Sequence, residues 1–328
     1  MNKRRQLIAA LGAGALATPF CSFAQQGKVW RVGILWTGKA SPDISPRVDA
    51  FRSGLRELGY IEGRDFSIEQ RHADSDLPRL QALAVELVTG KVDIIVAATT
   101  PAALAARKVS QDLPILIVTV GDPVGSGLAA SLRHPGANVT GLTNLSTSLT
   151  TKHLDLLREM LPHLRRVGYM YNPDNAANVV NLKQFESDCG KLGFKAVRAP
   201  VRNVQDVTAA YVVLRNKNAQ GLIVSGANTN IDWRDTILAG AAKLRLPTVF
   251  ALTTFAESGG LIAYSSNFLH SYHRLASYAD KIFKGAKAGD LPIEQPSKFE
   301  TVVNLKTAKA LGITIPNSIL LRADKVIK

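Results

Sequence analysis

The 328-residue sequence predicts an α/β protein of two doubly wound, Rossmann-like lobes, each with a parallel central sheet. Three observations support this fold class: short β-branched runs that are apolar on both faces, amphipathic helices between them, and a weak internal repeat. Runs of this kind suit a parallel sheet that is covered by helices on both sides. The regular alternation of strand and helix then implies the doubly wound order.

Six runs are the expected central strands of the two sheets, and they cover residues 32–36, 92–97, 115–120, 167–171, 222–225 and 248–251. Between these runs, apolar residues recur at spacings of three and four, which is the period of an amphipathic helix. One such stripe consists of Val48, Phe51, Leu55 and Leu58. The helices are therefore expected to cover the sheets with these apolar stripes.

The internal repeat consists of four short patterns that recur in the same order. Arg31-Val32-Gly33 returns 135 residues later as Arg166-Val167-Gly168, and Leu58-Gly59 returns 134 residues later as Leu192-Gly193. Two further pairs, at residues 94–96 and 113–114, recur at offsets of 128 and 133. Their collinearity predicts two lobes with the same topology.

The first 24 residues have the pattern of a secretory signal peptide. Lys3, Arg4 and Arg5 precede an apolar stretch of about 14 residues, which is too short to span a bilayer of roughly 30 Å. Small residues of a cleavage site end at Ala24, and the Arg4-Arg5 pair also resembles a twin-arginine signal. We therefore expect export to the periplasm through a cleavable signal peptide, by either the general secretory or the twin-arginine route.

Cleavage after Ala24 lowers the net charge from +14 to +11, and the remaining basic residues are scattered among acids. Because no helix-turn-helix precedes the first strand, we expect no nucleic-acid partner. Cys189, the cysteine that remains, has helical spacing with apolar residues and is expected to be buried and structural. A dinucleotide-like loop at 125–130 lacks the acidic residue that should follow. We expect no metal, no cofactor, no catalytic residues and a monomeric protein.

A ligand site is expected at the loops that follow the strands. Ligands bind at the carboxyl ends of parallel strands, so two such sheets that face each other would form a cleft. Thr99 and Thr100 precede an expected helix and could cap it, hold an anion such as a carboxylate, or do both. The full set of candidate ligand-binding residues is Trp36, Thr37, Thr99, Thr100, Gly121, Asp122, Tyr171, Asn172, Asp174, Asn175, Ser225, Asn228 and Thr229.

Four of these candidates allow two interpretations each. Asp122 and Asp174 could accept hydrogen bonds from a ligand ammonium, or they could serve as turn residues beside a proline. Trp36 and Tyr171 end equivalent strands and could sandwich a flat ligand side chain, or they could pack in the core. The sequence leaves both pairs of alternatives open.

Several stretches resemble the ABC transporter substrate-binding proteins of the tryptophan/tyrosine type, which have the type I periplasmic-binding fold. They include FRSGLRELGY at 51–60, GDPVGSGL at 121–128 and HPGANVTG at 134–141, with further matches at 257–261, 280–287 and 299–312. Together these stretches run over nearly the whole mature chain. The resemblance implies two lobes that close around one small ligand and dock on a membrane permease.

The resemblance also implies that each lobe is discontinuous in sequence. The chain would cross near Thr143, Leu252 and Leu291, so that the first lobe holds residues 25–143 plus 252–290 and the second 144–251 plus 291–328. Site residues carried over from the family are Thr99, Thr100, Asp122, Asn172, Asn175 and Asn228.

Two departures from the family pattern leave the identity of the ligand undetermined. This chain has Ser265-Ser266 where relatives often have Gly-Pro, and its loop at 225–228 differs from the frequent Gly-Asp-Pro. The expected ligand is an amino acid, aromatic or branched, or a related small carboxylate. The alternatives are a periplasmic enzyme with an active site in the cleft and a sensory module that presents its ligand to a membrane receptor.

Overall fold

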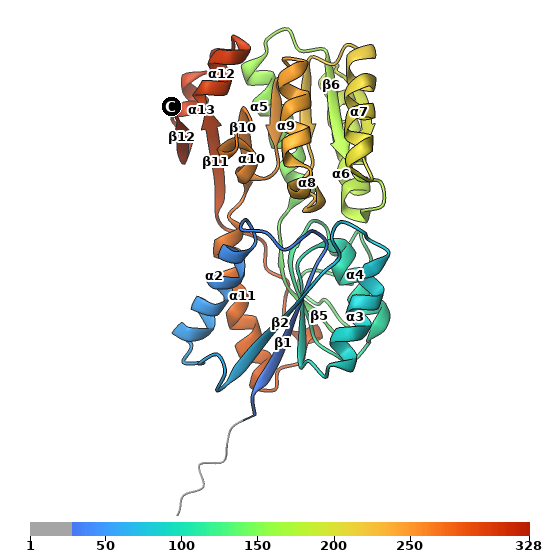
Figure 1. The fold of residues 1–328 in the computed structure, drawn as a ribbon, viewed down its shortest axis with the longest axis vertical. Helices are drawn as coiled ribbons and strands as arrows, with labels where there is room; N and C mark the ends of the chain where they lie inside the picture. The colour runs from blue at the N-terminus through green and yellow to red at the C-terminus, as the bar shows by residue number, and fades with distance from the viewer. Residues whose placement is uncertain (1–27) are drawn as a thin grey trace, which may run out of the picture.

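The structure, a computed structural model, describes residues 28–328, and the expected signal peptide lies outside the described residues. It contains two α/β lobes that are stacked along the long axis of the molecule (Figure 1). The first lobe forms the lower half of Figure 1 and the second lobe the upper half. The predicted two-lobe α/β fold is confirmed.

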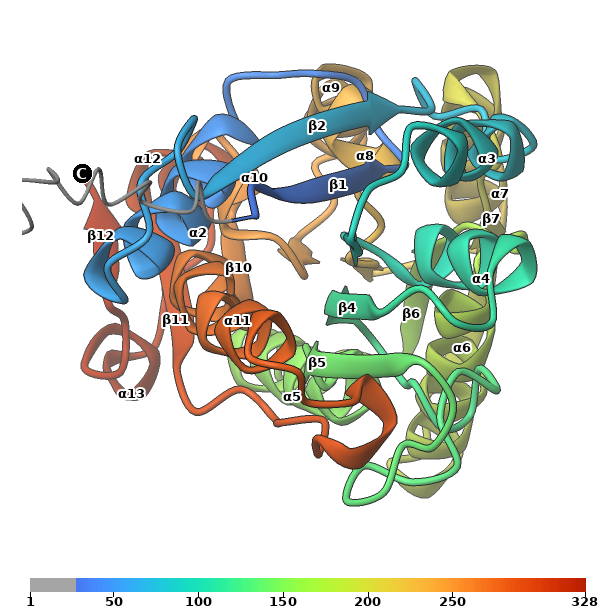
Figure 2. The ribbon, with the colours of Figure 1, turned by 90° about the horizontal axis from the view of Figure 1, so that it is seen from below.

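The first lobe has a five-stranded parallel sheet in the order β2-β1-β3-β4-β5. Helices α2 and α11 cover one face and α3 and α4 the other, so the central strands are buried on both faces. Figure 2 shows the two helix layers on opposite sides of this sheet. The elements are β1 (Trp30–Trp36), α2 (Ser45–Glu57), β2 (Phe66–His72), α3 (Arg79–Thr89), β3 (Ile94–Ala97), α4 (Thr100–Val109), β4 (Ile115–Val120), β5 (Val139–Thr143), α11 (Phe268–Phe283) and the 3-10 helix η1 (Ala288–Asp290).

The second lobe has a seven-stranded sheet in the order β12-β11-β10-β9-β8-β6-β7, in which β10 and β11 pair antiparallel. Its helical elements are α5 (Ser146–Met160), α6 (Ala176–Lys191), α7 (Val204–Asn216), α8 (Thr229–Asp232), α9 (Arg234–Lys243), α10 (Thr253–Glu257), α12 (Leu305–Leu311) and α13 (Asn317–Leu320). Its strands are β6 (Arg166–Tyr171), β7 (Lys195–Pro200), β8 (Gly221–Val224), β9 (Thr248–Phe250), β10 (Ile262–Ser266), β11 (Phe299–Asn304) and β12 (Lys325–Ile327).

The internal repeat reflects a shared topology of the two lobes. The order β2-β1-β3-β4-β5 of the first sheet returns as β7-β6-β8-β9-β10 in the second. Gly33 of β1 and Gly168 of β6 are equivalent, and a Cβ at either would meet a leucine from the covering helix, Leu87 or Leu214. These glycines therefore let a helix approach the first strand of each lobe closely.

The chain crosses between the lobes three times, and two of the crossings differ from the sequence expectation. The second crossing lies at Asn267 rather than near Leu252, because β10 pairs with β9 and β11 of the second sheet. The third lies at 295–298 rather than near Leu291, since Glu294 still bridges to β5 at Leu142. The first crossing follows β5 at Thr143, as expected.

The crossing segments are bonded to one another or to their neighbours. The Thr143 amide donates to the Glu294 carbonyl at 3.0 Å, and the Asn267 amide donates to the Lys298 carbonyl at 2.9 Å. Three short crossing segments joined in this way are the kind of connection found at hinges between two lobes.

Gly54 makes the close contact between α2 and α11 possible. A Cβ at Gly54 would lie 2.5 Å from the His273 carbonyl oxygen and 2.7 Å from the Ala276 Cβ. We expect Gly54→Ala to lower the free energy of unfolding by about 1–3 kcal/mol, because two packed helices must separate. Denaturant unfolding measures this change.

Gly190→Ala is the matched control for Gly54→Ala. Gly190 lies in α6, and a Cβ there meets no atom within 4 Å. The control should stabilise the protein by about 0.5–1 kcal/mol, because alanine favours the helix. Equal effects of the two substitutions would contradict the packing role of Gly54.

Candidate functional site

A polar cleft lies between the lobes, at the carboxyl ends of strands from both sheets. It is lined by Thr37, Leu77, Thr99, Thr100, Pro101, Thr119, Gly121, Asn144, Ser146, Asn172, Asn175, Ala177, Asn178, Asn181, Gly226, Ala227, Asn228 and Thr229. Its cavity volume of about 20 Å³ has room for roughly one water molecule.

Eight of the thirteen residues predicted from the sequence line this cleft, namely Thr37, Thr99, Thr100, Gly121, Asn172, Asn175, Asn228 and Thr229. They come from both lobes, since residues up to Gly121 belong to the first and those from Asn172 onward to the second. The structure thus brings together loops that are far apart in sequence.

Two helices point their N-termini at the cleft, one from each lobe. Helix α4 begins at Thr100 and is capped by Thr99, whose hydroxyl accepts from the Ala102 amide at 3.3 Å. Helix α6 begins after Asn175, whose side-chain oxygen accepts from the Ala177 amide at 3.1 Å. Amide groups in the first turn of a helix and the helix dipole favour an anion at both places. Thr99 and Asn175 therefore cap helices and line the cleft at once.

The two aspartates that were expected to meet a ligand ammonium do not line the cleft. The Asp122 carboxylate accepts from the Gly125 amide at 2.8 Å and so closes its own turn. The Asp174 side chain is half exposed and lies 3.4 Å from the Arg202 guanidinium. For both residues, the turn interpretation fits the structure.

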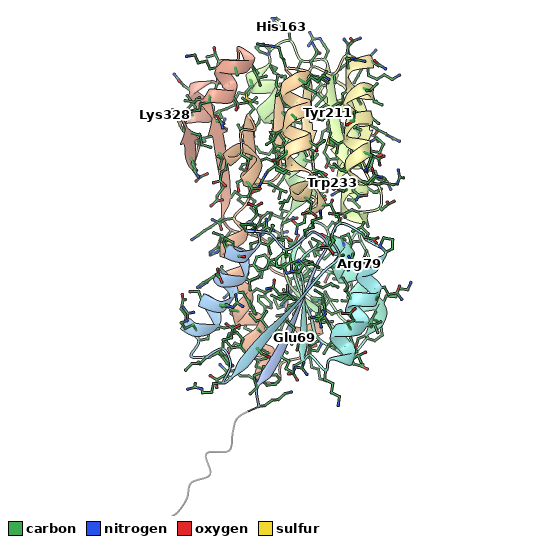
Figure 3. The ribbon with its side chains drawn as sticks, in the orientation of Figure 1. Glu69, Arg79, His163, Tyr211, Trp233 and Lys328 are labelled. Atoms are coloured by element: carbon green, nitrogen blue, oxygen red, sulfur yellow. The ribbon has the colours of Figure 1, made fainter. Side chains whose placement is uncertain are left out.

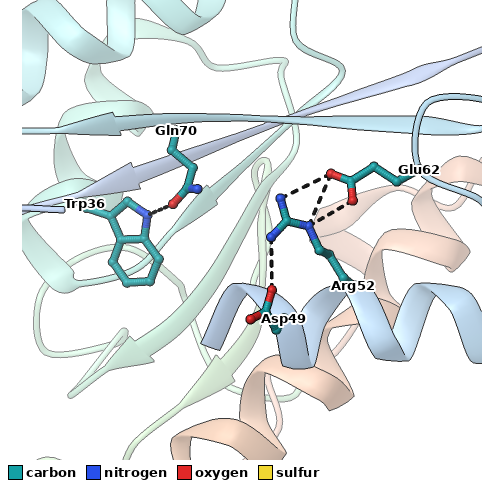
Figure 4. A network of polar contacts seen from close by, with 5 residues as sticks. All are labelled: Trp36, Asp49, Arg52, Glu62 and Gln70. Atoms are coloured by element: carbon teal, nitrogen blue, oxygen red, sulfur yellow. Dashed lines mark hydrogen bonds and ion pairs between the residues drawn. The ribbon is translucent and has the colours of Figure 1, made fainter. Parts of the chain in front are cut away.

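The two aromatic residues expected to sandwich a ligand pack in the core. Trp36 is fully buried, stacks on Tyr272 and donates from its indole nitrogen to the Gln70 side chain at 3.0 Å (Figure 4). Tyr171 is 9% exposed and stacks on Tyr169 instead of lining the cleft. The core interpretation is therefore the one that fits both.

Ser225 lies just behind the cleft. Its hydroxyl donates to the Asn178 side-chain oxygen at 3.0 Å, so it positions a lining residue without lining the cleft itself. Asn178 in turn accepts from the Asn172 amide at 3.1 Å. The expected direct contact of Ser225 is replaced by this supporting role.

A second small polar space, which we call the hinge chamber, adjoins the cleft. It shares Asn144, Ser146, Asn181 and Gly226 with the cleft and is otherwise lined by Leu149, Thr150, His153, Tyr169, Ala251, Ser265, Ser266 and Phe268. The serine pair that departs from the family pattern thus lies at the inner end of the site. This position supports the view that the departure affects the ligand.

Burial lowers the pKa of His153 to about 4 although its Nε2 lies 2.7 Å from the Tyr264 carbonyl oxygen. The unfolded chain takes up this proton near pH 6.5, so the free energy of unfolding should fall between pH 6.5 and about 4. The loss should total about 3 kcal/mol, and below pH 4 this group should contribute no further change. Denaturant titrations at several pH values measure it.

His153→Gln separates this effect from the other titrating groups. Glutamine does not ionise, so the variant lacks this loss of stability. The free energy of unfolding of wild type, minus that of the variant, should therefore decrease as the pH falls from 6.5 to about 4. Parallel stability curves for the two proteins would show that His153 does not titrate as its burial requires.

Direct contacts join the lobes at the mouth of the site, and we call this group of residues the latch. The Asp232 carboxylate accepts from the Lys39 amide at 3.0 Å and from the Ser75 hydroxyl. Arg234 forms an ion pair with Asp43 at 2.8 Å. Figure 3 shows Trp233, which lies between these two latch residues in sequence, at the lobe boundary, with Arg79 across from it. The latch therefore favours approach of the lobes.

Part of the second-lobe wall was not predicted from the sequence. Asn178 and Asn181 line the cleft at 3% and 2% exposure, and they follow Asn175 at helical spacing on α6. Three asparagines at positions i, i+3 and i+6 at the start of this helix were a signal of a polar wall in the sequence. Asn144 and Ser146 were missed because they follow β5 (Val139–Thr143), a strand that was not among the six predicted runs.

Among residues 28–328, no cluster of three or more His, Cys, Asp or Glu residues could hold a metal ion. In the same part of the chain, no helix is both long enough and apolar enough to cross a membrane. Cys189 is buried, as expected, and burial raises the pKa of its thiol to about 12.

Fold and cleft together define a two-lobe binding protein with the type I periplasmic-binding fold, which solved periplasmic binding proteins share. The family model described as ABC transporter substrate binding protein matches residues 40–327. The chain belongs to this family.

Relatives within the family include proteins with stated ligands. A tyrosine-binding protein from Clostridioides difficile is 26% identical over 272 residues, which cover 83% of this chain and 78% of that protein. A domain from Streptococcus pneumonia, solved in complex with L-Trp, is 25% identical, covers 92% of this chain and 100% of that one, and superposes with a TM-score of 0.85.

A third relative has been solved without ligand, in an open form. The ligand-free, open structure of a substrate-binding protein with adhesive properties from Clostridium difficile is 28% identical, with coverages of 92% and 100%, but its TM-score is 0.66. At the same coverage, this chain therefore superposes better on the L-Trp complex than on the ligand-free, open structure.

Proposed function

We propose that this chain is the exported solute-binding protein of an ABC importer, which closes its two lobes around a small carboxylate ligand, an amino acid or a related compound. In this proposal it delivers the ligand to a permease in the inner membrane and catalyses no reaction. It works as a monomer in the periplasm, and the cleft residues of both lobes contact the ligand.

The observation that carries this proposal is the polar cleft between two lobes, with a helix N-terminus from each lobe directed at it. Such an arrangement binds an anionic group with both lobes at once. The names of the relatives, a tyrosine-binding protein and a complex with L-Trp, support a carboxylate-bearing ligand.

The mechanism is a shift of population between open and closed lobes. A ligand that touches both lobes binds the closed arrangement more tightly, so it stabilises that arrangement, which a permease can recognise. Affinities near micromolar correspond to about −8 kcal/mol, which a few charge-assisted hydrogen bonds and a buried side chain supply.

Mass spectrometry of the compound released from natively purified protein tests the proposal. We expect a small carboxylate in the wild-type preparation and much less in an Asn228→Ala variant, because Asn228 lines the cleft. Asn216→Ala, at an exposed position on α7, is the matched control and should retain the ligand. A wild-type protein that carries no compound, and that binds none from an amino-acid and carboxylate panel by calorimetry, would contradict the proposal.

The transport step needs its own test. Once the released compound is known, a strain that lacks this protein should lose high-affinity uptake of that compound. Unchanged uptake in the deletion strain, together with an altered transcriptional response to the compound, would favour the sensory alternative.

A further inference from the structure

We infer that the ligand of the cleft is an organic carboxylate that carries no ammonium group. This inference rests on the proposed function. It narrows the expected ligand from an amino acid or a related carboxylate to a carboxylate without an amino group. It follows from which hydrogen-bonding groups of the cleft are already used inside the protein and which remain available.

Five of the six asparagines that line the cleft already use their side-chain oxygen as an acceptor within the protein. For four of these five, the donor is a backbone amide. A backbone amide can only donate, so it fixes which end of the asparagine side chain is oxygen. The five residues are Asn144, Asn172, Asn175, Asn178 and Asn181.

Hydrogen-bond donors remain available. With their oxygens turned to the protein, Asn172, Asn175 and Asn178 have their amide nitrogens left for a ligand. Two further lining groups, the Asn228 side-chain nitrogen and the Thr229 hydroxyl, are buried without any hydrogen-bond partner. Buried polar groups without a partner are rare, and a ligand oxygen between the lobes would satisfy both.

The helix ends add to this excess of donors. Helix α4 has 10 residues and helix α6 has 16, and both direct the positive end of the dipole at the cleft. Donors from side chains and from helix N-termini therefore converge from both lobes, which is the environment that a carboxylate requires.

No carboxylate is available to balance a ligand ammonium. The residues that line the cleft and the hinge chamber include no Asp, Glu, Lys or Arg. Asp122 and Asp174 are turned to their own loop and to Arg202, and Asp232 is engaged in the latch. An ammonium in this cleft would lose its water, meet two helix N-termini and find no counter-charge.

Matched pairs of ligands test the inference. The probes are L-tryptophan with indole-3-propionate, L-tyrosine with 3-(4-hydroxyphenyl)propionate, and L-leucine with 4-methylpentanoate, each titrated by calorimetry after the protein has been unfolded and refolded to remove bound compounds. Members of a pair differ only by the ammonium group. We expect the propionate or pentanoate member to bind at least tenfold more tightly in every pair that binds.

Ala227→Asp adds the missing counter-charge. Ala227 lines the cleft at 3% exposure, so an aspartate there should shift the preference within each pair toward the amino acid by at least tenfold. Ala227→Ser, of similar size and without charge, should leave the preference as in wild type. If the aspartate variant does not fold, the comparison of pairs on wild-type protein decides the inference alone.

The outcomes separate the inference from the proposed function. Tighter binding of the amino acid by wild-type protein overturns the inference and leaves the solute-binding function standing. Binding of no member of any pair, together with no compound released from native protein, overturns both. A released compound that carries a carboxylate and no basic nitrogen supports both.

Discussion

Replacing Gly121 with valine is expected to hold the two lobes apart and to weaken ligand binding by about 100-fold. Gly121 follows β4 of the first lobe, and a Cβ there would lie 2.2 Å from the Ser146 hydroxyl oxygen and 3.1 Å from the Ala177 Cβ. Both of these neighbours belong to the second lobe. The valine therefore conflicts with the closed arrangement and meets neither neighbour when the lobes are apart.

Ser146 cannot turn away from the new side chain without cost. Its hydroxyl accepts from the Asn181 side-chain nitrogen at 3.0 Å, and rotation would break that hydrogen bond. Because Ala177 is also close, a branched side chain at Gly121 has no simple way to fit. Binding to a protein that is rarely closed is weakened in proportion to the closed fraction.

Calorimetry with the ligand and small-angle scattering measure the effect of Gly121→Val. The radius of gyration should increase, while the denaturation midpoint should stay near that of wild type. Gly190→Val on the exposed end of α6 is the matched control and should change neither affinity nor radius. A Gly121→Val protein that binds ligand like wild type would show that closure does not bring Gly121 against the second lobe.

The central strands could be predicted from sequence because their local pattern reflects their burial. All six predicted runs lie within or overlap observed strands, from β1 to β9. Strands near the sheet edges, such as β2 and β7, were missed because they mix polar and apolar residues. Burial on both faces leaves a continuous apolar signal, and an edge position does not.

The second crossing could not be predicted for a different reason. Strand β10 reads Ile-Ala-Tyr-Ser-Ser, which has little strand character, and its place is set by pairing with β9 and β11. Strand β11 begins 33 residues after β10 ends. A pairing at that separation is a tertiary interaction that no local pattern records.

The site was partly predictable because topology places strand ends at one edge, whereas side-chain direction depends on local bonds. Thr99 and Asn175 could be placed because a helix start fixes both the cap and the cleft wall. Asp122 could not, because its carboxylate turns back to the Gly125 amide. A sequence shows that an acidic residue follows a strand. Whether its carboxylate accepts from its own turn or from a ligand depends on a single hydrogen bond, which the sequence does not show.

Removing the Asp232 carboxylate is expected to make closure of the lobes less favourable by deleting contacts between them, whereas Gly121→Val adds a clash. Asp232→Ala deletes the bonds from the Lys39 amide and the Ser75 hydroxyl, which join the lobes without touching the cleft. Hydrogen bonds to a charged group contribute about 1.5–3 kcal/mol, so the closed fraction and the ligand affinity should fall by about tenfold or more. In the open protein these groups are hydrated, so the stability of each lobe should be retained.

Asp235→Ala is the control for this prediction, since Asp235 is an exposed acid in the first turn of α9, three residues after Asp232 at the end of α8. It should leave both the radius of gyration and the affinity unchanged. In the Asp232→Ala protein, the rate of ligand dissociation should rise more than the association rate falls, because the latch acts after the ligand is in place. Equal affinities of the two variants would mean that the ligand alone closes the lobes. A tenfold difference would mean that the Asp232 contacts contribute to the free energy of closure before the ligand adds its own.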